Sequence, residues 1–426
     1  MTSRTGLAGP RSLHIEHFAS EPEYAVYEVP YTANLKGTRL STAAVIQFSG
    51  SASAAGLVAG LPAAARAIRE AALSGLGECW LKIDAGGPLP LIVRQEITRL
   101  AGAMRVHDLD QRPSMEPATQ GWADPAHALH SGRVLLITGE ALVDAIAIRA
   151  ALAAGESLNP GLRFSDAPAL DLAATPARRH APQNSGDGVA ARYAAASRVI
   201  IKATAKSTDG LVSRSLNRPV SQAISSGLMK FSGIRPIHAT MGTAALAILM
   251  FAVMVLFGSP VGLVAGAILF QAASVFDGVD GEIARATYRT TDRGAMIDSL
   301  IDAATNLSFV AGIVINLAQR GRWGPAMFGI AGLAMLALGL TILGTRARRS
   351  GAPITFDGLK GRFRDSGSGW GKWAVWLTMR DFLALASVVL VVAGLTEQAI
   401  MAFSAIMAVW LGVVLTTHAR QSALGG

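Results

Sequence analysis

The chain has 426 residues, of which 51% are hydrophobic and only 16% are charged. Soluble domains carry about 25% charged residues, so this composition argues against a wholly soluble enzyme, a disordered chain or a coiled coil. The one cysteine, Cys79, rules out a disulfide framework and a cysteine-rich zinc or iron–sulfur site. The net charge of +9 indicates an anionic partner but does not identify it.

The N-terminal part, up to about residue 155, has the pattern of a soluble α/β domain. Its first residues contain no apolar core of the kind found in signal peptides, so we expect no signal peptide. Residue patterns predict strands at 41–48, 78–83 and 132–138 and an amphipathic helix at 61–75. Strand–helix–strand alternation predicts a mostly parallel sheet. The proline-rich segment 156–200 predicts a linker or irregular structure.

The C-terminal part carries long uncharged runs that predict membrane-spanning helices. No residue between Arg235 and Asp277 is formally charged. Because one span needs about 20 apolar residues, this run fits two helices joined by a tight turn at 258–262. Four further candidates are 295–318, 323–345, 373–395 and 398–417. The expected fold is therefore a polytopic α-helical membrane protein with six transmembrane helices and an N-terminal soluble α/β domain.

Positive charges gather in alternate loops of the membrane part. Residues 211–426 contain 18 Lys and Arg but only 10 Asp and Glu, whereas residues 1–210 contain 20 and 19. The segment before the first span is basic, as are the second and fourth connections, while the opposite loops offer only Arg320 and Arg322. The positive-inside rule then predicts that both termini face the cytoplasm.

A four-residue repeat of apolar side chains precedes the first span. It predicts an amphipathic helix in the membrane interface, with Pro219 near its start or at a kink. The repeat consists of Leu216, Val220, Ile224 and Leu228. Packing of this helix on the soluble domain is the alternative to contact with lipid.

Six of the ten acidic residues of this part lie between Asp277 and Asp302. Asp277 and Asp280 share one helix face, and Asp298 and Asp302 share another. Four carboxylates at the mouth of two adjacent helices repel one another unless cations bind between them, and Mg²⁺ is held by carboxylate oxygens. Two such ions can clamp a phosphoryl group during its displacement.

Small and basic residues accompany these acids. Gly281 and Ala284 leave a helix face that a bulky ligand can approach, and Gly294 lets the next helix start close by. Arg285, one turn after Gly281, can hold a phosphate oxygen in bidentate fashion. The alternative is that the acids are solvated and paired with nearby arginines, although ionisable residues at membrane depth are usually functional.

This pattern resembles the signature of the CDP-alcohol phosphatidyltransferases at every position. It reads Asp277-x-x-Asp280-Gly281-x-x-Ala284-Arg285, then eight residues, then Gly294-x-x-x-Asp298-x-x-x-Asp302. The resemblance covers the whole membrane part and the helix before it. It implies a homodimeric membrane enzyme that depends on two Mg²⁺ or Mn²⁺ ions per site.

The resemblance also implies roles for individual residues. Asp277, Asp280 and Asp298 would hold the metals, with Asp302 at the metal site as well and serving as the general base. Gly281, Ala284 and Arg285 would contact the CDP group. Many family members have Asn where this chain has Ile237, while Thr240 remains at the later polar position of the nucleotide site.

The implied reaction is the transfer of a substituted phosphate group. An acceptor hydroxyl loses its proton to Asp302 and attacks the β-phosphorus of a CDP-alcohol. The metals and Arg285 stabilise charge on the diphosphate, and CMP leaves.

The N-terminal domain resembles a sugar-phosphate nucleotidyltransferase-like domain. Together with the membrane part and the junction at 207–225, the layout is similar to bifunctional inositol-phosphate cytidylyltransferase/di-inositol-phosphate phosphate synthases. Such a domain needs basic residues against triphosphate charge, but none lies between Arg39 and Arg66. Glu140 follows Gly139 where a metal-binding Asp is expected. We therefore predict a non-catalytic domain that docks, regulates or stabilises the membrane part.

Other polar residues of this domain have simpler interpretations. Asp84, Glu140 and Asp144 are expected to be strand-end or capping acids. Cys79 is expected to pack as a small apolar residue.

The connection 346–372 carries seven basic residues and two acids. Attraction to anionic headgroups, capture of a phosphorylated acceptor and plain positive-inside topology all remain open for this connection. Arg289, Arg293 and Arg380 are candidates for holding an acceptor phosphate, and the sequence does not rank them.

The leading hypothesis is an integral membrane CDP-alcohol phosphotransferase of phospholipid biosynthesis, with a donor such as CDP-diacylglycerol. The alternatives are a synthase that joins CDP-inositol to an inositol phosphate, and a non-catalytic membrane scaffold or transporter. Nucleic-acid binding is not expected, because the basic residues sit at membrane edges. We expect a cytoplasmic α/β domain with its linker at 1–200, a junction at 201–235 and the membrane domain at 236–426. The expected location is the inner (plasma) membrane, with a cytoplasmic active site.

Overall fold

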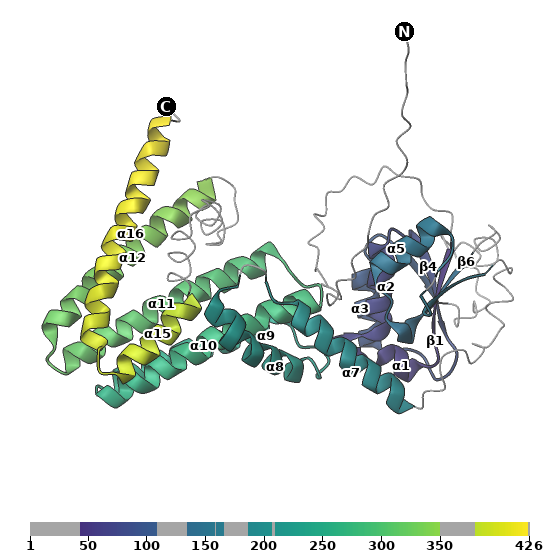
Figure 1. The fold of residues 1–426 in the computed structure, drawn as a ribbon, viewed down its shortest axis with the longest axis horizontal. Coiled ribbons are helices and arrows are strands. Elements are labelled where there is room, and N and C mark those ends of the chain that lie inside the picture. Colours follow the sequence, from purple (N-terminus) through teal and green to yellow (C-terminus); the bar gives the residue numbers. More distant parts are fainter. Residues whose placement is uncertain are drawn as a thin grey trace, which may run out of the picture. The chain divides into compact units, whose positions relative to one another are not determined.

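The structure is a computed structural model that describes residues 43–108, 134–157, 159–165, 186–206, 209–349 and 380–424 (Figure 1). All of these residues belong to one compact unit, residues 36–426. Within it, an α/β part comes first along the chain and is followed by a set of long helices.

The α/β part is built on a five-stranded sheet with the order β5-β4-β1-β6-β7. The first four strands in this order are parallel, and β7 is antiparallel to β6. The strands are β1 (Ala43–Phe48), β4 (Glu78–Ile83), β5 (Arg105–Asp108), β6 (Val134–Thr138) and β7 (Leu162–Ser165), with a separate hairpin of β2 (Leu57–Val58) and β3 (Leu61–Pro62). The predicted strands and the mostly parallel sheet are confirmed.

Short helices connect these strands. They are α1 (Ser51–Ala55), α2 (Ala63–Leu73), α3 (Leu91–Ala101) and α5 (Ala145–Ala154), with a 3-10 turn η1 (Gly139–Ala141). Helix α2 is the helix predicted at 61–75, and its alanine-rich face around Ile68 is buried against the sheet. The central strands β1 and β6 are largely apolar and buried, as expected for parallel strands covered on both faces, whereas the edge strands β5 and β7 carry polar residues.

The segment 156–200 is more ordered than the sequence analysis predicted. It contains β7 and most of helix α7 (Gly186–Ala203), so the expectation of a linker is wrong for these stretches. The sequence carries two weak signals of this order beside its prolines. Leu162 and Phe164 alternate with polar residues on the edge strand β7, and an apolar repeat in α7 buries Tyr193 in the core.

The membrane part consists of long helices preceded by a π-helical turn. They are η2 (Ser213–Asn217), α8 (Arg218–Leu228), α9 (Pro236–Leu256), α10 (Pro260–Ala286), α11 (Asp292–Gln319), α12 (Trp323–Arg349), α15 (Arg380–Val392) and α16 (Thr396–Leu424). Helices α9 to α12 and α16 are long and apolar enough to cross a membrane, which makes five candidate spans among the described residues.

The span predicted at 373–395, the fifth of the six in chain order, is not confirmed. The described residues of the range 373–395 form α15, which has 13 residues. A helix of that length rises about 20 Å, which is less than the roughly 30 Å hydrocarbon core of a bilayer. Residues 373–379 lie outside the described residues.

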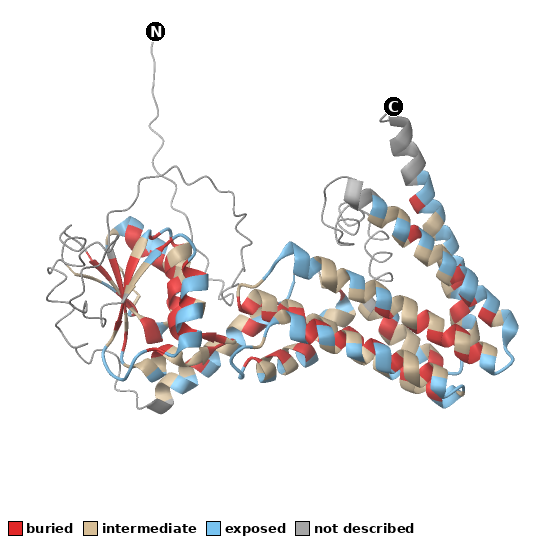
Figure 2. Cartoon of the chain, turned by 180° about the vertical axis from the view of Figure 1, so that it is seen from behind, coloured by how far each residue is buried: buried red, intermediate tan, exposed pale blue. Residues whose placement is uncertain are grey.

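Helices α9, α10 and α11 form the centre of the membrane part. Helix α9 packs on both α10 and α11, and Met254 fits against Gly266 and Gly312, where a Cβ atom would come within 2.9 Å or less of its side chain. In the most apolar 18-residue stretch of each helix, only 22% of α12 and 17% of α16 is buried, although both stretches have a mean hydropathy of 2.2. Figure 2 shows the exposed residues along these two helices. Exposed apolar surface of this extent fits contact with lipid.

Candidate active site

The signature aspartates lie on two neighbouring helices. Asp277 and Asp280 come from α10, and Asp298 and Asp302 come from α11. The carboxyl groups of Asp280 and Asp298 are neighbours, and Asp277 is close enough to act on both through its charge. Asp302 lies one turn beyond Asp298 and is half-buried. The i, i+3 and i, i+4 spacings thus bring three carboxyl groups together where the two helices meet.

Asp280 is held in place from a third helix. It is 7% exposed, and the hydroxyl of Thr240 on α9 donates a 2.7 Å hydrogen bond to its Oδ2. Thr240 thus orients a carboxylate, and its contact with a nucleotide stays a prediction. This bond ties α9 to α10 at the level of the acidic cluster.

The donor set suits a divalent cation. Neighbouring carboxylates repel one another unless a cation lies between them. Hard oxygen ligands of this kind are those preferred by Mg²⁺ and Mn²⁺. Among the described residues, however, no three His, Cys, Asp or Glu side chains are already arranged as a metal cage.

The glycine-rich face of α10 is covered by its own arginine. A Cβ atom on Gly281 would lie 3.0 Å from Nη1 of Arg285, so the guanidinium lies close against that glycine. Its Nε donates a 2.7 Å hydrogen bond to the backbone carbonyl of Thr204. Ala284, on the same helix, is half-buried. The residues expected to contact CDP therefore adjoin one another, with the guanidinium anchored by the junction.

A buried ion-pair network that the sequence analysis missed lies beside the aspartates. Glu282 is 0% exposed and accepts hydrogen bonds from Arg218 (2.9 Å), Ser221 (2.6 Å) and Ser225 (2.5 Å). Arg218 also donates two bonds, of 2.7 and 3.0 Å, to Asp209. Burial alone would lower the pKa of Arg218, but the bonds and charges of Asp209 and Glu282 outweigh burial and raise it. The arginine therefore stays charged between its two carboxylates.

This network fixes the orientation of helix α8. Its serines face α10, whereas Leu216 and Val220 are 43% and 46% exposed. Ile224 and Leu228 pack at the side, against the core that contains Val279 and Ile283. The predicted helix and the position of Pro219 in its first turn are confirmed. Ser221 and Ser225 lie four residues apart, next to members of the apolar repeat. This spacing was the sequence signal for the buried polar face.

The candidates for an acceptor phosphate lie in different environments. Arg289 forms an ion pair with Glu96 of α3. Arg293, in the first turn of α11, is exposed. The side chain of Arg380 and most of the basic connection 346–372 lie outside the described residues.

The turn after β1, where a nucleotidyltransferase would cradle phosphates, holds a carboxylate of the chain itself. Oε1 of Glu140 accepts 2.7 Å hydrogen bonds from the backbone N–H of Ser49, the hydroxyl of Ser49 and the hydroxyl of Ser53. The described part of this turn thus offers its donors to Glu140.

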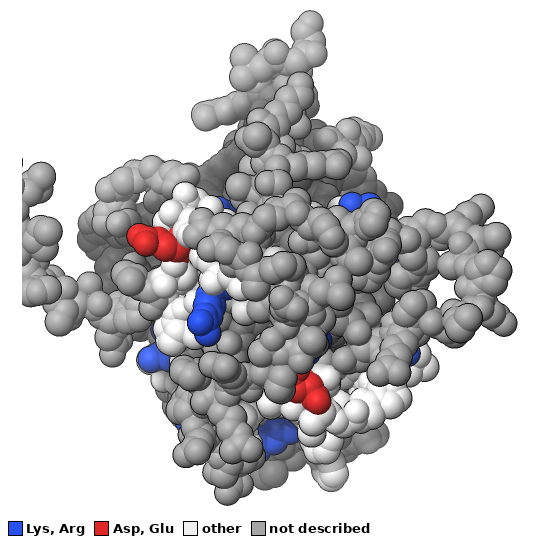
Figure 3. Space-filling view, turned by 90° about the vertical axis from the view of Figure 1, so that its right-hand side faces the viewer, with Lys and Arg blue, Asp and Glu red and all other residues white. Residues whose placement is uncertain are grey.

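On the face in Figure 3, the described basic and acidic side chains are scattered and do not gather into one patch.

The other predicted polar residues of the α/β part behave as expected. Asp144 caps α5 by accepting a 2.7 Å bond from the backbone N–H of Ala147. Asp84, at the end of β4, accepts bonds from Gln47 and pairs with Lys82 at 3.4 Å. Cys79 is 0% exposed in the core, and burial raises the pKa of its thiol to about 12.

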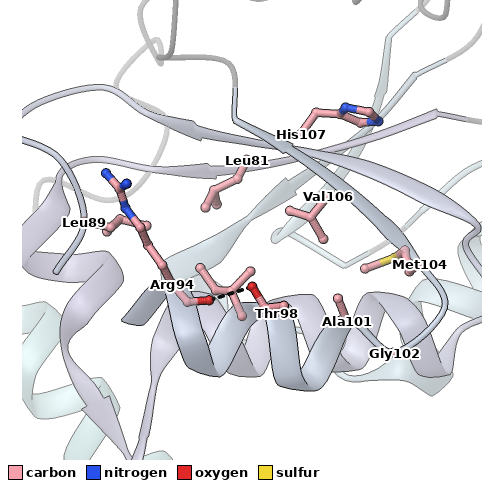
Figure 4. A pocket seen from close by; sticks show the side chains of 10 residues that line it. Leu81, Leu89, Arg94, Thr98, Ala101, Gly102, Met104, Val106 and His107 are labelled. Carbon is pink, nitrogen blue, oxygen red and sulfur yellow. Dashed lines mark hydrogen bonds between the residues drawn. The ribbon is translucent and has the colours of Figure 1, made fainter. Parts of the chain in front are cut away.

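A cavity of about 330 Å³ lies between α3 and strands β4 and β5 (Figure 4). Its lining is mixed: it includes the apolar residues Leu81, Ile97 and Met104 and the polar residues Arg94, Thr98 and His107. None of these residues belongs to the acidic cluster or to the turn that holds Glu140. The cavity is therefore separate from both candidate phosphate sites.

Comparison with known proteins finds a similarity in the membrane part. Residues 236–417 match the family described as CDP-alcohol phosphatidyltransferase. This match confirms the resemblance inferred from the eight-residue signature.

Curated relatives carry the name "Bifunctional IPC transferase and DIPP synthase". The protein of Aquifex aeolicus is 38% identical over 135 residues, which cover 31% of this chain and 30% of the relative. That of Thermococcus kodakarensis is 34% identical over 142 residues, covering 33% and 30%. That of Archaeoglobus fulgidus is 32% identical over 143 residues, covering 33% and 27%. The chain thus spans less than a third of the length of these relatives.

Proposed function

We propose that this chain is an integral membrane CDP-alcohol phosphotransferase. It transfers a substituted phosphate group from a CDP-alcohol, such as CDP-diacylglycerol, to an acceptor hydroxyl and releases CMP. The observation that carries this proposal is the meeting of Asp277, Asp280 and Asp298 between α10 and α11, inside the segment 236–417 that matches the family. Five long apolar helices support a substrate or product that resides in the membrane.

The acidic cluster would bind two Mg²⁺ or Mn²⁺ ions through Asp277, Asp280, Asp298 and Asp302. When bound, these ions neutralise charge on the diphosphate and orient it for displacement. Asp302 takes the proton of the acceptor hydroxyl, because it lies on the same face of α11 as Asp298. Thr240 holds Asp280 in a single orientation.

The nucleotide would lie on the face formed by Gly281 and Ala284. Arg285 exchanges its bond to the Thr204 carbonyl for a diphosphate oxygen, a charge-assisted bond that is stronger than the one it replaces. The absence of a side chain on Gly281 leaves room for this rearrangement.

The test is CMP release from radiolabelled CDP-diacylglycerol and CDP-inositol, each offered to several acceptors with Mg²⁺ or Mn²⁺. Asp302→Asn should lower turnover by about 10³-fold or more, while the variant folds and elutes as the wild type does. Asp292→Asn is the matched control, because Asp292 is an exposed acid in the first turn of the same helix. Near-normal CMP release by Asp302→Asn would refute its role as base. A transporter or scaffold would release no CMP at all.

A second candidate is a synthase that joins CDP-inositol to an inositol phosphate. The name shared by the curated relatives favours this reaction. The same screen separates the two candidates by the donor that is consumed. An acceptor phosphate would be held by Arg293, Arg289 or Arg380, and the exposure of Arg293 places it first among the three.

The α/β part is proposed to be non-catalytic. Support comes from Glu140, whose carboxylate takes the donors that a nucleotide phosphate would need. The full chain supplied with CTP and inositol phosphate should therefore release no pyrophosphate. Metal-dependent pyrophosphate release would overturn this proposal.

Location and assembly complete the proposed function. The loop charges support an inner-membrane enzyme of phospholipid biosynthesis whose termini and active site face the cytoplasm. The family resemblance supports a homodimer, which mass measurement in lipid nanodiscs would test.

A further inference from the structure

The short connection between the two aspartate-bearing helices is held by the α/β part. Arg66 of α2 donates a 2.8 Å hydrogen bond to the carbonyl of Ala286, the last residue of α10. Arg99 of α3 donates to the carbonyls of Thr287 (2.9 Å) and Tyr288 (3.1 Å). Three successive carbonyls at the end of α10 thus accept bonds from two arginines.

These bonds satisfy groups that the helix cannot satisfy itself. The last carbonyls of a helix have no partner within it, and the helix dipole places partial negative charge there. Arginine side chains are suited to both features. Arg66 is buried at 5% exposure and also donates 3.0 Å to the carbonyl of Val58, so its guanidinium bridges the hairpin of the α/β part and the end of α10.

Tyr288 strengthens the same contact. Its φ of 52° lies in the left-handed region, which is unfavourable for a residue with a Cβ atom. Its ring lies 5.5 Å from Arg66 and 5.4 Å from Arg69, measured from guanidinium carbon to ring centroid. Its hydroxyl donates a 2.5 Å bond to Glu70. Such a conformation persists where the surroundings over-determine it.

Apolar packing and one more ion pair complete the interface. Ala59, from the hairpin of the α/β part, lies in one buried cluster with Ile283 and Ala286 of α10. Arg289 of the connection pairs with Glu96 of α3. The end of α10 is therefore fixed by apolar packing and by charged side chains of both α2 and α3.

We propose that the α/β part acts as the C-terminal cap of α10 and thereby positions the aspartates. Ala286 lies six residues after Asp280, about 9 Å along the helix. A shift or fraying of this end would alter how Asp277 and Asp280 face Asp298. Arg66, Arg99 and Tyr288 are positioning residues, since their bonds go to the backbone at the end of α10 and to Glu70 of α2.

The test uses the full chain and a matched pair of variants. Arg99→Ala removes the bonds to Thr287 and Tyr288. Arg149→Ala is the control, because Arg149 also donates to a helix-end carbonyl, that of Leu73 at 2.7 Å, but inside the α/β part. Hydrogen exchange followed by mass spectrometry reports on peptides covering α10 and the start of α11.

Arg99→Ala should speed amide exchange at least tenfold in the last three turns of α10, which carry the aspartates, while Arg149→Ala leaves them unchanged. Tyr288→Phe, which removes only the hydroxyl, should act in the same direction with a smaller increase. Faster exchange confined to residues 287–291, or equal exchange in Arg99→Ala and Arg149→Ala, would overturn the positioning role.

A second readout is Mn²⁺ affinity, which should fall several-fold in Arg99→Ala and recover in part in Arg99→Lys. This readout rests on the proposed function, whereas the exchange measurement does not. A wild type that binds no Mn²⁺ would count against the metal-dependent function alone, and exchange would still decide the capping role. Unchanged Mn²⁺ affinity in Arg99→Ala, with normal wild-type binding, would overturn the positioning of the aspartates.

Discussion

Glu282→Ala tests whether the buried network holds helix α8 on α10. The substitution removes the acceptor of three hydrogen bonds, from Arg218, Ser221 and Ser225. It leaves Arg218 with Asp209 as its carboxylate partner among the bonds described. The free energy of unfolding should therefore fall.

The size of the loss follows from the burial of the pair. Removing one partner of a buried ion pair costs about 3–5 kcal/mol. Asp209 still neutralises Arg218, and Ser221 can turn to the Arg218 carbonyl, which already lies 3.3 Å away. Both effects reduce the expected cost, so Glu282→Ala should lower the free energy of unfolding by about 3 kcal/mol, the lower end of that range. Glu282→Gln keeps an acceptor oxygen but no charge, so about half that loss is expected.

The assay is the rate of thermal inactivation in nanodiscs, with exchange in α8 as a local probe. Glu397→Ala is the control, since Glu397 pairs with Arg322 at the surface, where the arginine side chain is 55% exposed. An exposed pair contributes about 1 kcal/mol or less. If Glu282→Ala is no less stable than Glu397→Ala, the network does not hold the two helices together.

Two further outcomes follow from the same structure. Cys79 should react with iodoacetamide at pH 8 less than a tenth as fast as a free cysteine, because its pKa of about 12 leaves little thiolate. After unfolding it should react at the normal rate. Rapid labelling of the native protein would contradict its burial. Thr240→Val should lower Mn²⁺ affinity by about 10–100-fold, since the hydroxyl orients Asp280. Thr243→Val removes a buried hydroxyl that, among the described residues, is bonded to the Ala239 carbonyl on its own helix, so it should not lower the affinity. Equal losses in both variants would refute the assignment.

The helices and strands were largely predictable because their signals are local. The uncharged run 236–276 breaks where expected: Ser259 caps α10 by accepting a bond from Gly262 N–H, and Pro260 occupies the first turn. Strands β1, β4 and β6 could be predicted from their own apolar runs, without knowledge of their partners in the sheet. The misjudged segment 156–200 has weaker local patterns, since β7 depends on pairing with β6 for its stability.

The aspartate spacing predicted that Asp277 and Asp280 share one helix and Asp298 and Asp302 the next, whereas the approach of Asp280 to Asp298 depends on how the two helices pack. The residues that hold the helices were missed for a different reason. Arg218 and Glu282 are 64 positions apart, Arg99 and Thr287 are 188 apart, and Arg66 and Ala286 are 220 apart. An arginine on an amphipathic helix gives no local sign that its partner is a distant carbonyl. Such pairs can be found only when the tertiary structure is known.

The carboxylate of Glu140 has a thermodynamic consequence for the α/β part. A ligand that binds only the folded state stabilises it by an amount that grows with the logarithm of the ligand concentration relative to its Kd. Here Ser49 and Ser53 already donate to an acceptor within the same chain. If this part binds no nucleotide, as proposed, its folded population does not depend on the cellular CTP level, and the end of α10 keeps the same support whether nucleotide is abundant or scarce.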